Sequence, residues 1–272
     1  MNKTDQADIK KWFMDFTGQY RNKDGTMHPV LLLKYDHSLR VASDSRDIAI
    51  ELGWRPSDIV IAETIGLLHD VSRFPQFLEY RTFLDHKSFD HGERGYQIIS
   101  KSGVLSGLCE PERNRILNSV RYHNRQTIDP GMDPTELRFV NLIRDADKLD
   151  ILSIVYETIK NNRHKDYPEI LSHVDPDGPA TPELIAEIRK YGYGSYENVK
   201  SLTDMNLMRM TWVYNINYLP ALRRLAERGH LDQLDETMIK NPDIEELLAK
   251  ARKFVTDKLA EKNSVKISGY TS

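Results

Sequence analysis

The sequence has little cysteine, no long apolar run and almost no excess of either charge. Cys109 is the only cysteine among 272 residues, so the chain cannot form an internal disulfide and suits a reducing compartment. The net charge is −3, which predicts no general attraction to nucleic acid or to an anionic membrane. The sequence lacks any run of about 18 apolar residues, the length that would span a bilayer. Residues 1–8 also lack the apolar core of a signal peptide. We therefore expect a cytoplasmic protein whose partners include neither a nucleic-acid polymer nor a membrane; the oligomeric state stays open.

Clean strand alternation is also scarce, and almost every segment has apolar residues at the helical period. This pattern predicts an all-α protein. Pro29 suits a first helical position, Gly53 can end that helix, and Ser57 can cap the next one. We read residues 72–90 as a long irregular connection and residues 164–182 as a loop rich in Pro, Asp and Gly. The expected helices cover residues 5–20, 29–52, 57–70, 89–102, 111–124, 135–162, 182–191, 198–227 and 242–262.

Neither half of the chain shows a linker of flexible composition. We therefore predict a single helical domain over residues 1–272, with a core at about 25–162 and a C-terminal helical extension at about 181–262.

His69 and Asp70 stand side by side at the end of the apolar run Ile65–Leu68. Two adjacent polar groups in such surroundings need partners, because an unpaired buried charge costs several kcal/mol or more. A divalent metal is the simplest partner for an imidazole nitrogen and a carboxylate oxygen. The alternative is a helix end with a hydrogen-bonded histidine and an exposed aspartate.

Further metal-type side chains fall on the apolar faces of other expected helices. His37 shares a face with Leu33 and Val41, His123 lies one turn after Val120, and Asp147 lies on an apolar stripe. Taken alone, each histidine favours the interpretation as a satisfied core residue, but buried aspartate is rare unless it is paired. Asp150 lies one turn after Asp147 and can support the site from behind it. Asp145 projects away from that face, and we expect it to be structural or exposed.

The ordered set His37, His69-Asp70 and Asp147 resembles the His … His-Asp … Asp signature of the HD-domain superfamily of metal-dependent phosphohydrolases. The resemblance covers roughly residues 30–160 and includes the local phrases at 69–74 and 145–150. It implies an HD-domain-like helical bundle, to which the C-terminal helices are an addition.

His91 and His123 lie between the doublet and the last aspartate. This order is similar to the six-ligand branch of the family, which holds two metals and includes diadenosine tetraphosphate hydrolases and HD-GYP cyclic-dinucleotide phosphodiesterases. The Gly-Tyr-Pro part of the latter motif is absent, which argues against a cyclic dinucleotide. His86 is the rival to His91 but lacks its His-x-x-Gly context. We assign no role to the remaining histidines, His28, His164, His173 and His230.

By this resemblance one ion is held by His37, His69 and Asp147, and the other by His91 and His123. Asp70 would bridge the two ions. Iron or manganese is favoured, and zinc, magnesium, nickel or cobalt stays open. The implied enzyme hydrolyses an ester or anhydride bond of a nucleotide or another small phosphorylated metabolite through a metal-bridged hydroxide.

Cations should line such a site, because charge spreads over the phosphoryl oxygens in the transition state. Arg73 and Lys148 are the best candidates, although Lys148 is equally readable as a solvated helix charge. Arg125 and Arg144 are weaker candidates. No general acid can be identified from the sequence.

Two other functions use the same residues. One is a mixed-valence di-iron oxygenase similar to inositol oxygenase, which the ligand types cannot distinguish from a hydrolase. The other is a catalytically silent ligand-binding module, against which the complete ligand set argues. No residue outside the ligand set identifies the substrate.

Overall fold

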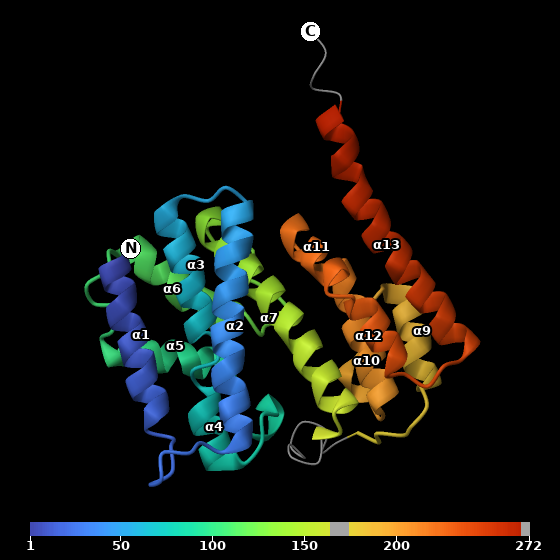
Figure 1. Cartoon of the computed structure of the whole chain (residues 1–272), viewed down its shortest axis with the longest axis horizontal. Helices are drawn as coiled ribbons and strands as arrows, with labels where there is room; N and C mark the ends of the chain where they lie inside the picture. Colours follow the sequence, from blue (N-terminus) through green and yellow to red (C-terminus); the bar gives the residue numbers. More distant parts are fainter. Residues whose placement is uncertain (164–173, 268–272) are drawn as a thin grey trace. The chain divides into compact units, whose positions relative to one another are not determined.

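A computed structural model describes residues 1–163 and 174–267 of the chain (Figure 1). Its contacts divide the chain into two compact units, Met1–Asp150 and Ile151–Ser272. Helices are the regular elements throughout the described residues, which confirms the predicted all-α class. None of the helices described is both long and apolar enough to cross a membrane. The expectation of a single domain with a core and an extension remains a prediction.

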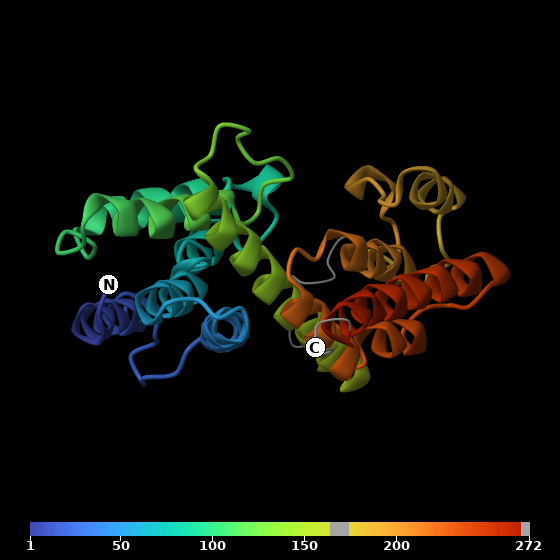
Figure 2. The same ribbon diagram turned by 90° about the horizontal axis from the view of Figure 1, so that it is seen from above.

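The first unit is built around α3, which packs against α2, α1 and α6, while α5 packs against α6 (Figures 1 and 2). Ile61, Ile65 and Leu68 of α3 are completely buried, so this helix forms the centre of the unit's apolar core. The elements of this unit are α1 (Lys3–Gly18), α2 (Pro29–Glu51), α3 (Pro56–Leu68), α4 (Arg73–Tyr80), the 3-10 helix η1 (Asp85–Lys87), α5 (His91–Ser102), α6 (Glu110–Tyr122) and the first part of α7 (Pro134–Lys160).

Local sequence signals set most of the helix ends in this unit. Pro29 opens α2, and Gly53 follows it with a φ of 68° that suits glycine. Asp90 accepts a hydrogen bond from the backbone N–H of Glu93 and so caps α5 at the residue before His91. The predicted cap at Ser57 is wrong: Arg55 precedes the helix, and Pro56 occupies its first turn.

The segment 72–90 differs from its predicted irregular form, because residues Arg73–Tyr80 form α4. Pro75 is tolerated there because the first-turn N–H groups of a helix have no intrahelical acceptor. Phe74 and Phe77 are buried on one face of α4, whereas Leu78 and Tyr80 are exposed. Phe74 and Phe77 are therefore spaced three residues apart, as on one face of a helix, but this short pattern is hard to recognise among the charged residues around it.

The second unit is organised by α13, which contacts α9, α10, α11, α12 and η4. The predicted helix over 198–227 is wrong in its middle, because Ile216 and Tyr218 are extended and Pro220 starts a new helix. Of the predicted loop 164–182, residues 164–173 lie outside the described residues. The elements are α9 (Pro182–Tyr191), η3 (Tyr196–Asn198), α10 (Leu202–Met210), η4 (Thr211–Asn215), α11 (Leu219–Glu227), α12 (His230–Glu236) and α13 (Pro242–Ile267).

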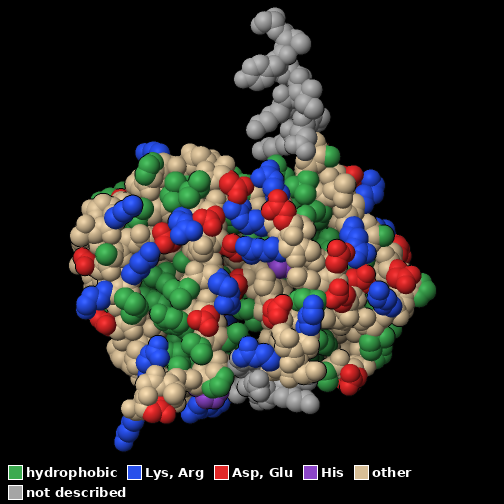
Figure 3. Space-filling model, in the orientation of Figure 1, with side chains coloured by type: hydrophobic (Ala, Val, Ile, Leu, Met, Phe, Trp, Pro, Cys, Tyr) green, Lys and Arg blue, Asp and Glu red, His purple; other side chains and the backbone are tan. Residues whose placement is uncertain are grey.

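Charged side chains are mixed over the face of the molecule that Figure 3 shows. Lys and Arg side chains alternate there with Asp and Glu side chains, and neither sign dominates. The even mixture fits the net charge of −3 and offers no basic surface on that face.

Candidate metal centre

Six metal-type side chains of the first unit come together from five helices. They stand where helices end or begin, or on a helix face turned to the core. His69 directly follows α3 and His123 directly follows α6, while His91 is the first residue of α5. The other members lie on α2, in the turn after α3 and on α7, and the full set is His37, His69, Asp70, His91, His123 and Asp147.

The first half of the cluster joins α2, the end of α3 and α7. The Nε2 atom of His37 lies 3.2 Å from Nε2 of His69 and 3.1 Å from Oδ1 of Asp147. Nε2 of His69 lies 3.6 Å from the same oxygen of Asp147. The Oδ2 atom of Asp70 completes this group at 3.6 Å from His37 and 3.7 Å from His69.

The second half uses the other oxygen of the same aspartate. Oδ1 of Asp70 lies 3.6 Å from Nε2 of His91 and 3.7 Å from Nε2 of His123. The two imidazole nitrogens are 3.0 Å apart. Asp70 therefore faces both halves of the cluster, one with each carboxylate oxygen.

The other ring nitrogen of His69 and of His123 is bound to the backbone. Nδ1 of His69 donates to the carbonyl of Gly66 at 2.8 Å, and Nδ1 of His123 donates to the carbonyl of Val120 at 2.7 Å. A carbonyl can only accept, so Nδ1 carries the proton in both rings. These acceptors are carbonyls of the last helical turn, which are available because α3 and α6 end here.

His37 and His91 are oriented in the same way by carboxylates. Nδ1 of His37 donates to Asp150 at 2.6 Å, and Nδ1 of His91 donates to Asp85 at 2.5 Å. All four histidines therefore turn an Nε2 lone pair towards the cluster, next to two carboxylates. Groups that only accept hydrogen bonds repel one another at these distances, and a cation among them removes the conflict. The donor set thus fits divalent metal ions, with the second ring nitrogens held as metal-binding histidines require.

The charge states of the cluster fit the same conclusion. Burial acts to raise the pKa of Asp70, but the charges of Lys34, His69 and Arg73 hold it well below its usual range. Burial lowers the pKa of His91 to about 4, assisted by the charge of Arg73. Burial acts to lower the pKa of His37, but the neighbouring carboxylates Asp147 and Asp150 raise it. The pKa of Asp147, like that of Asp70, is held well below its usual range, so both carboxylates are charged and their surroundings favour a cation.

The family model of the HD domain matches residues 35–152. This segment is an HD domain. The matched range contains every member of the six-residue cluster, and proteins of this family are generally metal-dependent hydrolases. Comparisons with curated proteins and with solved structures found no match.

Around the HD-domain cluster, Asp85 is a support that the sequence did not indicate. Besides holding His91, its carboxylate accepts hydrogen bonds from Arg73, Gln76 and Asn124. Asp85 lies in the segment that was expected to be irregular, so no helical spacing related it to His91. These bonds tie the segment after α4 to the start of α5.

Arg73, the predicted phosphate-binding residue, is largely committed to the protein. One of its terminal nitrogens donates to Gln76, to the carbonyl of Phe83 and to Asp85 at distances from 2.6 to 3.0 Å. The other lies 3.2 Å from Nε2 of His91. Arg73 is therefore a positioning residue in this structure, and its contact with substrate remains a prediction.

The remaining predicted cations lie on the α7 side and at the end of α6. Lys148 is half-buried beside Asp147, and burial lowers the pKa of its ammonium group. Arg125 donates to Glu93 at 3.0 Å, and burial lowers the pKa of Arg144. Asp145 is fully buried, so of the two expectations for it only the structural one applies.

Three histidines outside the cluster lie among the described residues, and none of them is grouped with the six clustered side chains. His86 is exposed on η1, and His91 rather than His86 lies beside His123. His28 caps α2 and packs against Phe77, while His230 is buried in the second unit. His164 and His173 lie outside the described residues.

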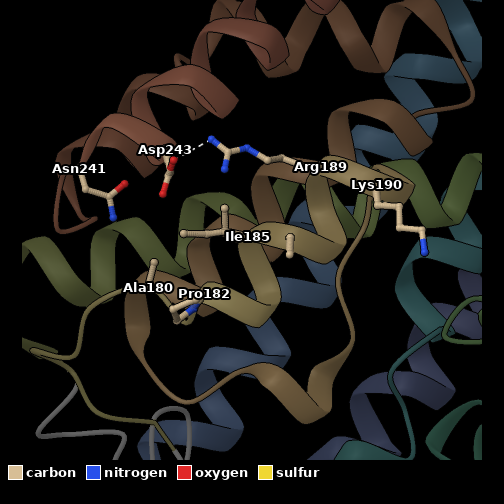
Figure 4. A pocket seen from close by; sticks show the side chains of 8 residues that line it. Ala180, Pro182, Ile185, Arg189, Lys190, Asn241 and Asp243 are labelled. Atoms are coloured by element: carbon tan, nitrogen blue, oxygen red, sulfur yellow. Dashed lines mark hydrogen bonds and ion pairs between the residues drawn. The ribbon is translucent and has the colours of Figure 1, made fainter.

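The second unit has an open pocket of a different character (Figure 4). It lies between α9 and the start of α13, and Ala180, Pro182 and Ile185 supply apolar walls. Arg189 at its edge donates to Asp243 at 2.7 Å and also to Glu246, so its charge is already paired. Among the described residues that line it, the pocket presents no group of converging metal-type or nucleophilic side chains comparable to the HD-domain cluster.

Proposed function

We propose that the protein is a metal-dependent phosphohydrolase that acts on a nucleotide or another small phosphorylated metabolite. The observation that carries the proposal is the position of Asp70, whose two carboxylate oxygens face two separate pairs of imidazole nitrogens. In this assignment one ion takes His37, His69 and Asp147 as ligands, and a second takes His91 and His123. Asp70 is shared between the two ions.

Bound divalent ions would supply a water of lowered pKa and would neutralise charge on phosphoryl oxygens. The chain's own residues orient the ligands: Asp150 and Asp85 hold the outer ring nitrogens of His37 and His91. Arg40 donates to Asp150 at 2.6 Å and so fixes that carboxylate in turn. Removing a residue that orients a metal ligand in this way typically lowers metal affinity or activity by about 10–100-fold.

The experiment is an elemental analysis of purified protein, with iron and manganese as the favoured metals, followed by a phosphate-release screen over nucleotides and dinucleotides. We expect nearly two metal equivalents per chain in the wild-type protein. The double variant His91→Ala/His123→Ala should stay folded, hold about one equivalent fewer and release little phosphate, because the second ion loses both imidazole ligands. His86→Ala is the matched control, since it removes an exposed histidine of the same segment.

Two equivalents in the double variant would defeat the dinuclear assignment. Full activity with one equivalent would mean that His91 and His123 are ordinary core residues. Oxygen consumption with ferrous iron in the absence of phosphate release would favour the oxygenase alternative. Protein that binds no metal at all would favour a silent ligand-binding module.

A further inference from the structure

Lys34, which is not among the predicted site residues, also reaches the cluster. It lies on α2, three residues before His37, and a helix turns side chains at this spacing to the same face. Its ammonium nitrogen donates to Oδ2 of Asp70 at 2.8 Å, and its side chain is 18% exposed. The same nitrogen lies 5.5 Å from the centre of the Phe83 ring. Lys34 is therefore held at the cluster and is still open to solvent.

Two other nearby cations, Arg73 and Arg40, are engaged in the scaffold, although Nε of Arg73 also lies 3.4 Å from Oδ1 of Asp70. Arg73 donates to Gln76 and Asp85, and Arg40 is paired with Asp150. An ammonium group has three N–H donors. Among the described residues, the side chain of Lys34 donates to Asp70. Lys34 thus combines a position beside Asp70 with unused donor capacity.

Under the proposed function, bound metal ions would neutralise Asp70, so the positive charge of Lys34 would be available to another anion. Two divalent ions would bring more positive charge than the carboxylates of Asp70 and Asp147 balance, while Asp150 and Asp85 are already paired with Arg40 and Arg73. In the loaded site the ammonium group of Lys34 would then face a cationic centre. A bound anion would balance this excess of positive charge. The lysine ammonium is a compact point charge and suits a single phosphate oxygen.

We propose that Lys34 is a substrate-binding residue that donates a hydrogen bond to a phosphoryl oxygen beside Asp70. This inference rests on the proposed phosphohydrolase function and goes beyond it, because it names the group that recognises the phosphate. The ring of Phe83 lies 5.5 Å from the ammonium nitrogen and adds a cation–π attraction that favours its position near Asp70.

The test is calorimetric titration of inorganic phosphate into metal-loaded protein, with metal content measured on the same samples. Lys34→Met should bind phosphate about ten-fold or more weakly than wild type, because a hydrogen bond to a charged group is lost. Its metal content should equal that of wild type. Lys34→Arg keeps the charge and should bind phosphate more tightly than Lys34→Met. Lys10→Met is the matched control, because Lys10 likewise pairs with a largely buried carboxylate, that of Glu63 at 2.8 Å.

Unchanged phosphate affinity in Lys34→Met would overturn the proposal, as would a wild-type protein that binds no phosphate. Loss of metal from Lys34→Met, to the extent seen in Asp70→Asn, would overturn it too, since Lys34 would then only support Asp70. The outcomes separate the two hypotheses. If phosphate binding depends on Lys34 but no substrate releases phosphate, the hydrolase function is refuted and the Lys34 site is kept. If phosphate is released equally by wild type and Lys34→Met, the hydrolase function is kept and the Lys34 site is refuted.

Discussion

The four clustered histidines obtain their orientation from two kinds of acceptor, backbone carbonyls and carboxylates, and one of the two carboxylates was not indicated by the sequence. His69 and His123 end helices and donate to carbonyls three residues earlier, so their orientation follows from local helix geometry. Asp150 is one turn from Asp147 on the same helix, and its supporting role was foreseen. Asp85 reaches His91 through a turn that helical spacing cannot describe. Prediction therefore worked where a contact follows from helix periodicity and missed contacts made by connecting segments.

Lys34 shows the same limit in another form. Its spacing from His37 was visible in the sequence, but lysines on helices are usually solvated. Only the approach of α2 to the turn after α3 shows that its ammonium group meets Asp70. The clustering of the six residues could be predicted because their histidines and aspartates follow a known order, whereas the cation beside them could not.

Asp58, which is not one of the clustered residues, should make the stability of the protein depend on pH. It is buried in the first turn of α3, with Arg55 at 3.1 Å and Arg138 at 2.8 Å. Burial acts to raise its pKa, but hydrogen bonds from Arg138 and Arg55 hold the pKa below its usual value. Asp58→Asn should lower the free energy of unfolding at pH 7 by about 2–3 kcal/mol, because bonds to a charged group are lost. Urea denaturation of both proteins measures this difference.

The pH dependence provides the control for Asp58. A carboxyl with a lowered folded-state pKa stabilises fully above its unfolded pKa, about 3.9, and loses that contribution as the pH falls through the folded value. The gap between wild type and Asp58→Asn should stay constant from pH 7 to about pH 5 and close below about pH 4. Asp47→Asn, which removes a partly exposed ion pair with Arg46, should change stability by less than about 1 kcal/mol. A gap that persists undiminished in acid would show that packing, rather than charge, explains the effect.

At the scale of elements, most helices were predicted with ends within a few residues, and the errors have identifiable causes. The segment after His69-Asp70 looked irregular because only the spacing of Phe74 and Phe77 carries the helical period of α4, and one pair does not establish a period. The long helix expected at 198–227 was inferred from a continuous apolar stripe. That stripe continues through η4 and an extended stretch, and Pro220 was the signal that should have divided it. Apolar spacing alone does not show where a chain stops being helical.

The close approach of α2 and α3 depends on a glycine, and its replacement should damage the metal centre. A Cβ atom at Gly66 would lie 2.6 Å from the Cα of Ala42, and backbone atoms cannot yield as a flexible side chain does. Gly66→Ala should therefore destabilise the protein by about 1–3 kcal/mol, the usual cost of overpacking. It should also lower metal content, because His69 lies three residues after Gly66 and its Nδ1 donates to the carbonyl of Gly66. Thermal denaturation and elemental analysis measure the two effects.

Gly18→Ala is the control for the helix-packing argument. Gly18 also lies in a helix, α1, and an added Cβ atom there would meet no atom within 4 Å. Alanine should be neutral there or stabilise by up to about 1 kcal/mol. If Gly66→Ala behaves like Gly18→Ala and retains its metal, the close contact between α2 and α3 does not position His69.

At the scale of the whole molecule, the clustered ligands and their supports all lie within Met1–Asp150, the first unit. The C-terminal helices supply none of the six ligands, so the sequence order that identified the HD domain also delimited the site. What those helices contribute could not be predicted, because they carry an ordinary apolar core pattern and no set of chemically distinctive residues. Met205 and Met208 of α10 are buried, whereas Trp212, Ile216 and Leu219 further along the same apolar stripe are partly exposed.

This distribution predicts where metal should stabilise the protein. An ion that binds the folded state only, at about 100 times its dissociation constant, adds roughly 2.7 kcal/mol. Manganese or ferrous iron added to chelator-treated protein should therefore slow amide hydrogen exchange in the helices that carry ligands, α2, α3, α5, α6 and residues 134–150 of α7. The measurement is exchange mass spectrometry with α9 and α13 as the comparison, because the described residues of these helices include none of the six ligands. Asp70→Asn should remove most of the slowing, since the carboxylate that faces both halves of the cluster is lost. Slowing confined to α9 and α13, or equal slowing in wild type and Asp70→Asn, would place the bound ion away from the HD-domain cluster.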